Sequence, residues 1–367
     1  MKKDEGCHEC GTRPSVPSGH GDAPASEHPH DMVLLAGVRP GARHGQHTAK
    51  ALEELRRPEH KLQVTDLALP LGDRGVSLIG IMDIDPQRSL GDYQNTGYFL
   101  LVEGAPQKAP ALEPHPASRL EPPITAVVID PGLRDGDWIR ATLGISRCDV
   151  FFTHFHLDHW IGYEPYRGQP FYASPLCKTV LTQMAGAERT GKGIFVEGRL
   201  TDYHRSPLPI RAANDAERLL PIREKIRPVT GNEPYRNDLF GLDFFELPYG
   251  QTEGTLYGLL EAGCVKVLFA SDLFVCINDQ LKIEPHYAFK PKRAVIEDIS
   301  VMLRALLGKD APVTEDAVAN ANLARVAGPD LLAMGHGLLD FERNRPAIAH
   351  LLEELEDLIR INREHII

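Results

Sequence analysis

Thr153-His154-Phe155-His156-Leu157-Asp158-His159-Trp160 is the stretch of sequence that decides the fold. It places three imidazoles and one carboxylate within six positions, directly after the apolar run 148–152. A run of this length fits a buried strand. In extended backbone, residues two apart point the same way, so His154 and His156 can converge on one point.

The second half of the stretch continues this pattern. If the chain turns at Leu157, Asp158 and His159 are directed to a second point a few ångströms from the first. Neutral imidazole and carboxylate are ligands of zinc, iron and manganese. The stretch therefore predicts two partly built metal sites side by side.

The run resembles the H-x-H-x-D-H signature of the metallo-β-lactamase superfamily. Other stretches resemble landmarks of that family and stand in its order: Asn95–Val102, Val127–Gly132, Leu268–Asp272 and Met334–Gly337. The similarity covers roughly residues 62–345. It implies an α/β fold, a four-layer αββα sandwich of two mixed β-sheets flanked by helices.

The resemblance also implies further ligands beyond the signature. Asp272 would be the aspartate that bridges two metal ions, and His336 would be the last histidine. The second site is then complete, with Asp158, His159, Asp272 and His336.

The first site departs from the pattern of the hydrolytic members. Where they usually have G-H-T-x-G, this chain has Gly250-Gln251-Thr252-Glu253-Gly254. A glutamine can ligate through its amide oxygen, which is neutral and favours oxygen-loving metals. The site of His154, His156 and Gln251 therefore holds a weakly bound ion or none. Gln251 as a ligand and as a structural turn residue both stay open, and His204 is a possible replacement.

The function implied is that of a metal-dependent hydrolase. A metal-activated hydroxide would attack an ester, thioester, lactone or amide of a small molecule. Asp158 would act as proton shuttle or as a ligand of the second site. The cofactor would be one or two divalent ions, with zinc first and iron or manganese as alternatives.

Two other functions stay open. If one metal binds, His159, Asp272 and His336 resemble the two-histidine, one-carboxylate arrangement of non-haem iron oxygenases. The chain could also be a non-catalytic member that binds a metal or ligand without turnover.

Composition limits the compartment and the partners. The chain has 367 residues, 42% hydrophobic and 25% charged, which is ample for one large domain. Its net charge of −11 opposes binding of polyphosphates, so we expect a small-molecule substrate and no nucleic acid. Without an apolar leader, a membrane-length run or a disulfide framework, we expect a cytoplasmic protein. The oligomeric state is not specified.

The domain organisation follows from shifts in composition. Residues 1–31 are rich in Pro, Gly, Ser and His and are expected to form a flexible tail. Its Cys7-His8-Glu9-Cys10 supplies only two of the four ligands of a structural zinc site, which favours the tail. Residues 32–367 are expected to form a single domain with an insertion at about 160–246 and a C-terminal helix. Thr314 is expected to cap a helix over 315–327.

Overall fold

The computed structural model describes most of the chain from residue 44 to residue 364. The segments outside the description are 72–73, 86–94, 103–125, 187–194, 197–198, 201–218, 220, 238–239, 253, 278–279, 284–291, 314 and 336. The predicted tail 1–31, His204 and His336 thus lie outside the described residues.

The first sheet is mixed and, within the described residues, has seven strands in the order β1-β2-β3-β4-β5-β6-β9. Neighbours from β1 to β4 are antiparallel, and β4, β5, β6 and β9 run parallel. The strands are β1 (Leu62–Leu71), β2 (Arg74–Asp83), β3 (Thr96–Val102), β4 (Ala126–Ile129), β5 (Cys148–Phe152), β6 (Phe171–Ala173) and β9 (Ile226–Pro228).

The second sheet is also mixed, with the order β10-β11-β12-β13-β16-β17 among described strands. Only the β13–β16 pair is parallel there. Its strands are β10 (Tyr235–Asn237), β11 (Leu242–Glu246), β12 (Leu256–Ala262), β13 (Val265–Ser271), β16 (Leu331–Met334) and β17 (Gly337–Asp340). Two short pairs lie outside the main sheets: β7 (Phe195–Val196) with β8 (Arg199–Leu200), and β14 (Val275–Ile277) with β15 (Gln280–Lys282).

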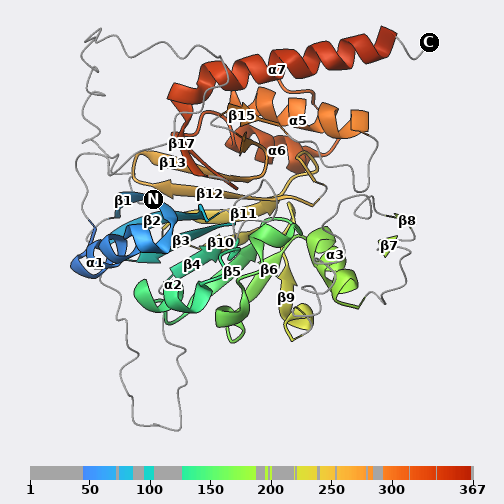
Figure 1. Cartoon of the computed structure of the whole chain (residues 1–367). Helices are drawn as coiled ribbons and strands as arrows, with labels where there is room; N and C mark the ends of the chain where they lie inside the picture. The colour runs from blue at the N-terminus through green and yellow to red at the C-terminus, as the bar shows by residue number, and fades with distance from the viewer. Residues whose placement is uncertain are drawn as a thin grey trace, which may run out of the picture.

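Helices cover the outer face of each sheet (Figure 1). The first sheet carries α1 (Gln46–Leu55), α2 (Gly136–Thr142) and α3 (Pro175–Gly186), and the second carries α5 (Lys292–Leu306), α6 (Ala317–Arg325) and α7 (Phe341–Glu364). One-turn helices are η1 (Pro58–His60), η2 (Leu157–His159), η3 (Glu164–Tyr166) and η6 (Arg223–Lys225). The predicted four-layer αββα sandwich is confirmed.

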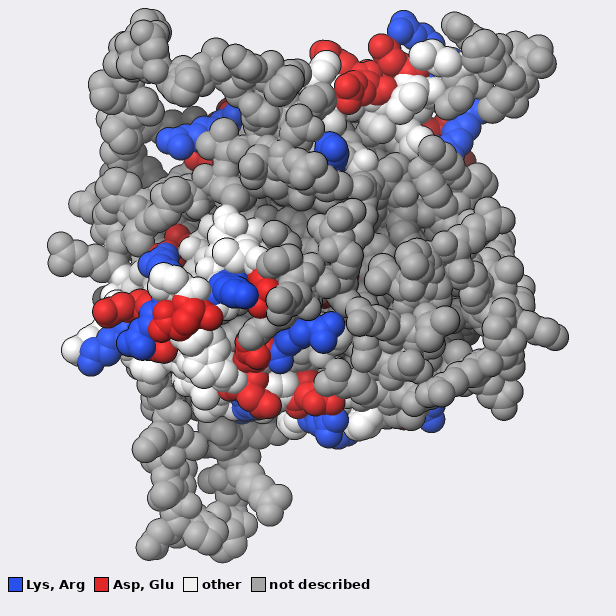
Figure 2. Space-filling view, in the orientation of Figure 1, with Lys and Arg blue, Asp and Glu red and all other residues white. Residues whose placement is uncertain are grey.

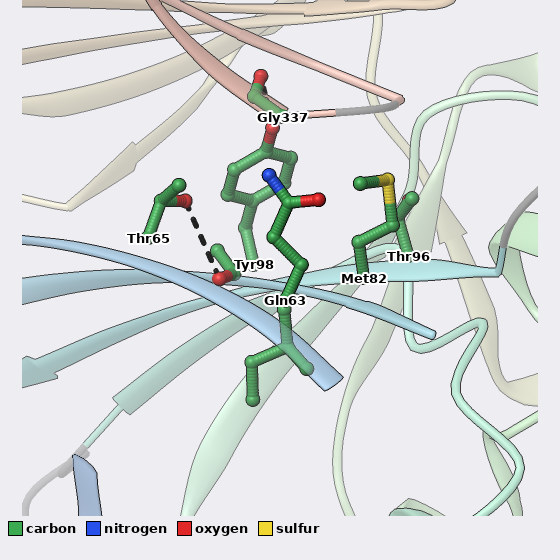
Figure 3. Close-up of a pocket in the computed structure, with 8 residues that line it drawn as sticks. Gln63, Thr65, Met82, Thr96, Tyr98 and Gly337 are labelled. Atoms are coloured by element: carbon green, nitrogen blue, oxygen red, sulfur yellow. Dashed lines mark hydrogen bonds between the residues drawn. The ribbon is translucent and has the colours of Figure 1, made fainter. Parts of the chain in front are cut away.

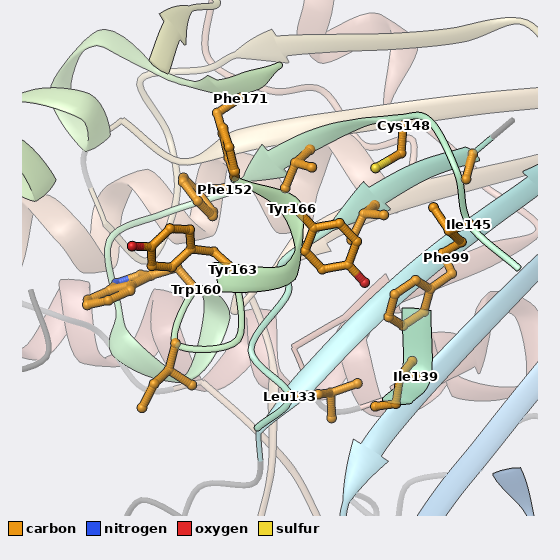
Figure 4. Close-up of a cluster of buried hydrophobic side chains, with 14 of the residues drawn as sticks. Phe99, Leu133, Ile139, Ile145, Cys148, Phe152, Trp160, Tyr163, Tyr166 and Phe171 are labelled. Atoms are coloured by element: carbon orange, nitrogen blue, oxygen red, sulfur yellow. The ribbon is translucent and has the colours of Figure 1, made fainter. Parts of the chain in front are cut away.

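Strand β5 lies at the centre of this packing because both of its faces are buried. Phe152 faces the helices, in the cluster with Phe171 and Tyr166 (Figure 4). Phe151 faces the other sheet and stacks on Phe244, with ring centroids 3.8 Å apart. Replacing a buried aromatic side chain of this kind by alanine lowers the free energy of unfolding by about 3–5 kcal/mol. The strand that carries the metal signature is therefore fixed from both sides.

One predicted helix boundary differs in the structure. Helix α6 begins at Ala317, and Asp316 is its N-cap, accepting hydrogen bonds from the backbone N–H groups of Val318 and Ala319. The carboxylate meets two N–H groups that the helix leaves unpaired, so the helix begins there. Thr314, the expected cap, lies outside the described residues.

A helix that spans a membrane must be both long and apolar. None in the described part of the chain is both long and apolar enough to cross a membrane.

Candidate metal centre

The signature begins where β5 ends, at the edge of the first sheet. After Phe152 the chain leaves the sheet, and η2 returns Asp158 and His159 toward His154. This return requires a glycine at position 132, because a Cβ there would lie 1.5 Å from the carbonyl oxygen of Asp158. The turn that follows β4 therefore shapes the loop that follows β5.

Asp272 brings the second sheet to the same place. It follows β13, and Ser271 before it has a left-handed backbone with φ of 53°. The β13–β16 register is irregular at this point. Backbone conformations of this kind cost energy and are concentrated at functional sites. Here the bend turns the Asp272 carboxylate toward the three histidines of the signature.

The first donor group consists of His154, His156 and Asp272. One oxygen of Asp272, Oδ2, lies 3.3 Å from His154 Nε2 and 3.8 Å from His156 Nδ1. His154 and His156 approach with ring centroids 4.4 Å apart. The period-two spacing thus brings the two imidazoles together, as the signature predicts.

The second donor group consists of Asp158, His159 and Asp272. Here the other oxygen of Asp272, Oδ1, lies 3.1 Å from His159 Nε2. His159 Nε2 is also 3.6 Å from Asp158 Oδ2. The two oxygens of one carboxylate therefore face two different donor groups.

The spacing of these atoms fits a shared ion. In a tetrahedral zinc site with bonds near 2.05 Å, ligand atoms lie about 3.3 Å apart. The contacts of 3.1–3.8 Å match that separation. Among the described residues, His154 Nε2, His159 Nε2 and Asp272 Oδ1 are buried atoms without a hydrogen bond. Buried polar atoms are normally paired, so these three fit a bound cation.

Asp130 holds the ring of His159, in the second donor group, through the ring nitrogen that does not face Asp272. Its Oδ2 accepts a hydrogen bond from His159 Nδ1 at 2.9 Å, which leaves Nε2 directed at Asp272. The same carboxylate accepts the backbone N–H and the hydroxyl of Thr153, each at 2.7 Å. A carboxylate behind a histidine fixes the tautomer and raises the basicity of the ligand nitrogen.

Neutral hydroxyl groups support the first donor group. His154 Nδ1 lies 2.9 Å from the Ser271 hydroxyl and 3.3 Å from that of Thr153. The two hydroxyls are 2.8 Å apart, so the three side chains form one buried network. The ring of His154 is therefore oriented by neutral hydroxyls in contact with its Nδ1, and the Asp130 carboxylate reaches it only through the Thr153 hydroxyl.

The charges set the protonation states of the buried donors. Burial lowers the pKa of His154 well below its usual value, and the nearby His159 adds to this. Burial alone would also lower the pKa of His159, but Asp272, Asp130 and Asp158 outweigh it and raise that pKa well above the usual value. Burial would raise the pKa of Asp272, yet the imidazoles of His159 and His154 hold it well below the usual carboxylate range.

Gln251 is buried in a turn that is tied to the same strand end. Just beyond the turn, the Leu256 N–H donates to the Thr153 carbonyl at 2.8 Å. Before it, the Tyr257 hydroxyl donates to the Tyr249 carbonyl at 2.7 Å. The Ser174 hydroxyl at the start of α3 donates to the Gly254 carbonyl. The turn is thus fixed beside the first donor group, and a ligand role for Gln251 stays a prediction.

The side chains of the two donor groups differ in how exposed they are. The side chains of His156 and Asp158 are 17% and 14% exposed, whereas that of His159 is fully buried. His156 and Asp158 are therefore the most exposed of the five side chains in the two donor groups.

The structure brings together five of the seven predicted ligands in the two donor groups. Gln251 lies in the adjoining turn, and His336 lies outside the described residues. Sequence reasoning gave Asp130, Thr153 and Ser271 no role in the site. Only their positions could have pointed to them: Asp130 and Thr153 directly follow the buried strands β4 and β5, and Ser271 is the last residue of β13.

The chain also matches a known protein family. The sequence model of the metallo-beta-lactamase superfamily matches residues 117–336, which is more than half of the chain. A search of curated proteins found no match.

Solved structures with a similar arrangement share little sequence with this chain. A putative metallo-beta-lactamase from Thermotoga maritima is 16% identical, with 77% of this chain and 100% of that chain covered and a TM-score of 0.39. AidC, a dizinc quorum-quenching lactonase, is 13% identical, with 69% and 89% covered and a TM-score of 0.40. A flavo di-iron protein from Thermotoga maritima is 13% identical, with 80% and 62% covered and a TM-score of 0.41. The family match, with the signature at the end of a central strand of a four-layer sandwich, shows that this chain belongs to the metallo-beta-lactamase superfamily.

Proposed function

We propose that this protein is a metal-dependent hydrolase that cleaves an ester, thioester, lactone or amide of a small molecule. One observation carries the proposal. Asp272 directs one carboxylate oxygen at the first donor group and the other at the second, 3.3 Å and 3.1 Å from their histidines. A carboxylate used from both sides fits a two-metal centre.

The chain itself prepares the donors for a cation. His154 is neutral at neutral pH because burial lowers its pKa, so Nε2 presents a lone pair. Asp130 holds His159 Nδ1, so Nε2 of that ring is the nitrogen left for a metal. Divalent ions held there would supply hydroxide at neutral pH and positive charge for a developing oxyanion.

Asp158 is placed for proton transfer. Its carboxylate is one of the two more exposed donors of the centre and lies 3.6 Å from His159 Nε2. A carboxylate at the rim can accept a proton from the attacking water and deliver it to the leaving group. We assign Asp158 this role, either alone or while also binding the second ion.

Metal identity decides between this reaction and its alternative. Zinc or manganese in protein purified without added metal supports hydrolysis. Iron together with oxygen consumption supports an oxidoreductase on the same fold instead. A folded protein that takes up none of the three metals overturns both.

The activity test uses a 4-nitrophenyl ester, a thioester with a thiol-trapping dye, and a lactone followed with a pH indicator. Asp158→Asn keeps the size of the side chain and removes its basic oxygen. We expect a fall of about 10²–10⁴-fold in kcat, the usual contribution of a positioned acid or base. Metal-loaded protein without turnover in all three assays contradicts the proposed reaction.

Other expectations about partners and compartment stay predictions. Figure 2 shows described Lys and Arg side chains intermingled with Asp and Glu on the face drawn. A small-molecule substrate, no nucleic-acid partner and a cytoplasmic location are proposed on the charge and composition of the chain.

A further inference from the structure

Tyr98 joins the two sheets next to the metal centre. It comes from β3 in the first sheet, and its ring points toward Gly337 of the second (Figure 3). Its hydroxyl lies against the Gly337 carbonyl at 2.7 Å and against the Met334 carbonyl. Met334 and Gly337 are paired at the end of the β16–β17 hairpin. One hydroxyl proton is thus shared by the two carbonyls that close the hairpin turn.

The Tyr98 ring is fixed by packing that does not involve its hydroxyl. Gly80 lies opposite Tyr98 in the β2–β3 pair, and a Cβ there would lie 2.8 Å from the ring. Phe269 of β13 also meets the ring edge to face, with centroids 5.7 Å apart. Replacing Tyr98 by Phe would therefore keep the packing and remove only the hydrogen bonds of the hydroxyl to the Met334 and Gly337 carbonyls.

The turn held by Tyr98 packs against the shared carboxylate. A Cβ placed on Gly335 would lie 1.9 Å from Asp272 Oδ1 and 3.2 Å from His159 Cε1. The Gly335 N–H also donates to the Ser271 carbonyl at 2.9 Å. Any outward movement of this turn would free the Asp272 carboxylate to rotate away from His159.

The surroundings of Tyr98 do not suit a substrate. The pocket beside it has room for about one water molecule. It lies between the side chains of Gln63, Thr65 and Met82 and the ring of Tyr98. Burial raises the pKa of Tyr98 well above its usual value, so the hydroxyl stays a donor.

We propose that Tyr98 is a positioning residue for the metal centre, whose hydroxyl holds the β16–β17 turn against Asp272. The inference rests on the proposed metal centre. It concerns how that centre is held in place and does not depend on which bond is cleaved.

The test compares Tyr98→Phe with Tyr235→Phe in the full chain. The Tyr235 hydroxyl also joins the two sheets, through Asp149 Oδ2 at 2.5 Å. Asp149 is at the opposite end of β5, about 13 Å along the strand from the signature. Both variants lose one inter-sheet hydroxyl, but only one of them loses it beside Asp272.

Three readouts are taken on each protein: the Zn²⁺ dissociation constant, the absorption spectrum with Co²⁺, and urea unfolding of the metal-free form. For Tyr98→Phe we expect zinc affinity to fall about 10–100-fold, as for other groups that orient ligands, with an altered Co²⁺ spectrum. For Tyr235→Phe we expect affinity within about twofold of the parent and an unchanged spectrum. Urea unfolding shows whether both variants stay folded.

The outcomes separate this inference from the proposed function. Equal affinity and spectrum in Tyr98→Phe and the parent overturn the positioning role alone. Equal losses in the two variants also overturn it, because general loosening then explains both. A parent protein that binds no metal overturns the centre and this inference together. A parent that binds metal but hydrolyses nothing overturns only the reaction, and the affinity comparison still decides the role of Tyr98.

Discussion

The two donor groups share Asp272, yet the groups behind their histidines differ. In the second donor group, His159 is supported by the carboxylate of Asp130 at 2.9 Å. In the first, His154 is supported by the hydroxyls of Ser271 and Thr153. A charged partner strengthens a ligand nitrogen more than a neutral one. From this difference we expect the second donor group to bind a metal ion more tightly than the first, whose ion would exchange more readily.

Removing the shared carboxylate tests whether the two groups form one centre. Asp272→Ala should abolish metal retention in both groups, since Asp272 is the described residue common to them. Metal content after gel filtration measures this. Asp316→Ala is the control, because it removes a carboxylate that caps α6 and costs about 1 kcal/mol without touching the centre. Unchanged stoichiometry in Asp272→Ala would contradict a shared centre.

Substituting the side chains that hydrogen-bond His159 and His154 tests whether the two donor groups differ in metal affinity. Asp130→Asn can place an amide N–H against the N–H of His159, so the tautomer that frees Nε2 is lost. We expect an affinity loss of about 10–100-fold at the tighter site. Ser271→Ala removes only a neutral partner of His154, and we expect a loss below tenfold, at the weaker site. Calorimetric titration with zinc resolves the two sites, and equal losses in the two variants would remove the distinction.

The pH dependence of binding should also differ between the groups. His159 has a raised pKa, so below that pKa a metal ion must displace its proton. Affinity at the second donor group should then fall about tenfold per unit of decreasing pH. His154 has a lowered pKa and releases no proton at neutral pH. Titrations in buffers of different ionisation enthalpy count the released protons, and the absence of release at pH 7 would contradict a protonated His159.

The smallest expected change concerns Gln251. Gln251→His should raise zinc affinity of the first donor group several-fold, because imidazole is a better donor to zinc than a neutral amide oxygen. The turn is already fixed at Tyr249 and Leu256, so little rearrangement is needed. An unaltered zinc titration would show that position 251 points away from the ion.

The fold and the residues of the two donor groups could be predicted from the sequence, partly from local spacing and partly from the family resemblance. His154 and His156 converge because they follow one strand at a spacing of two, and that geometry needs no other part of the chain. The αββα sandwich followed from a family signature whose landmarks stand in order. The cap of α6 was misplaced because Thr314 and Asp316 are both good caps, and only the start of the helix decides between them.

The side chains that orient the ligands could not be predicted from local sequence. Asp130 supports a histidine 29 positions further along the chain, and Ser271 one that lies 117 positions earlier. The Tyr98 hydroxyl meets a carbonyl 239 positions away. Such pairs depend on how strands of two sheets are arranged, and no local pattern encodes that arrangement.

The sequence by itself determined the kinds of donor atom and their order in the segment that follows β5, and the spacing of two between His154 and His156 predicted that their side chains point the same way. Only the tertiary structure decided that Asp272 turns one oxygen to each donor group, that Asp130 stands behind one histidine and hydroxyls behind the other, and that Gly335 packs against the carboxylate. These relations arise where two sheets meet, and packing across that junction fixes distances that the chain order leaves free.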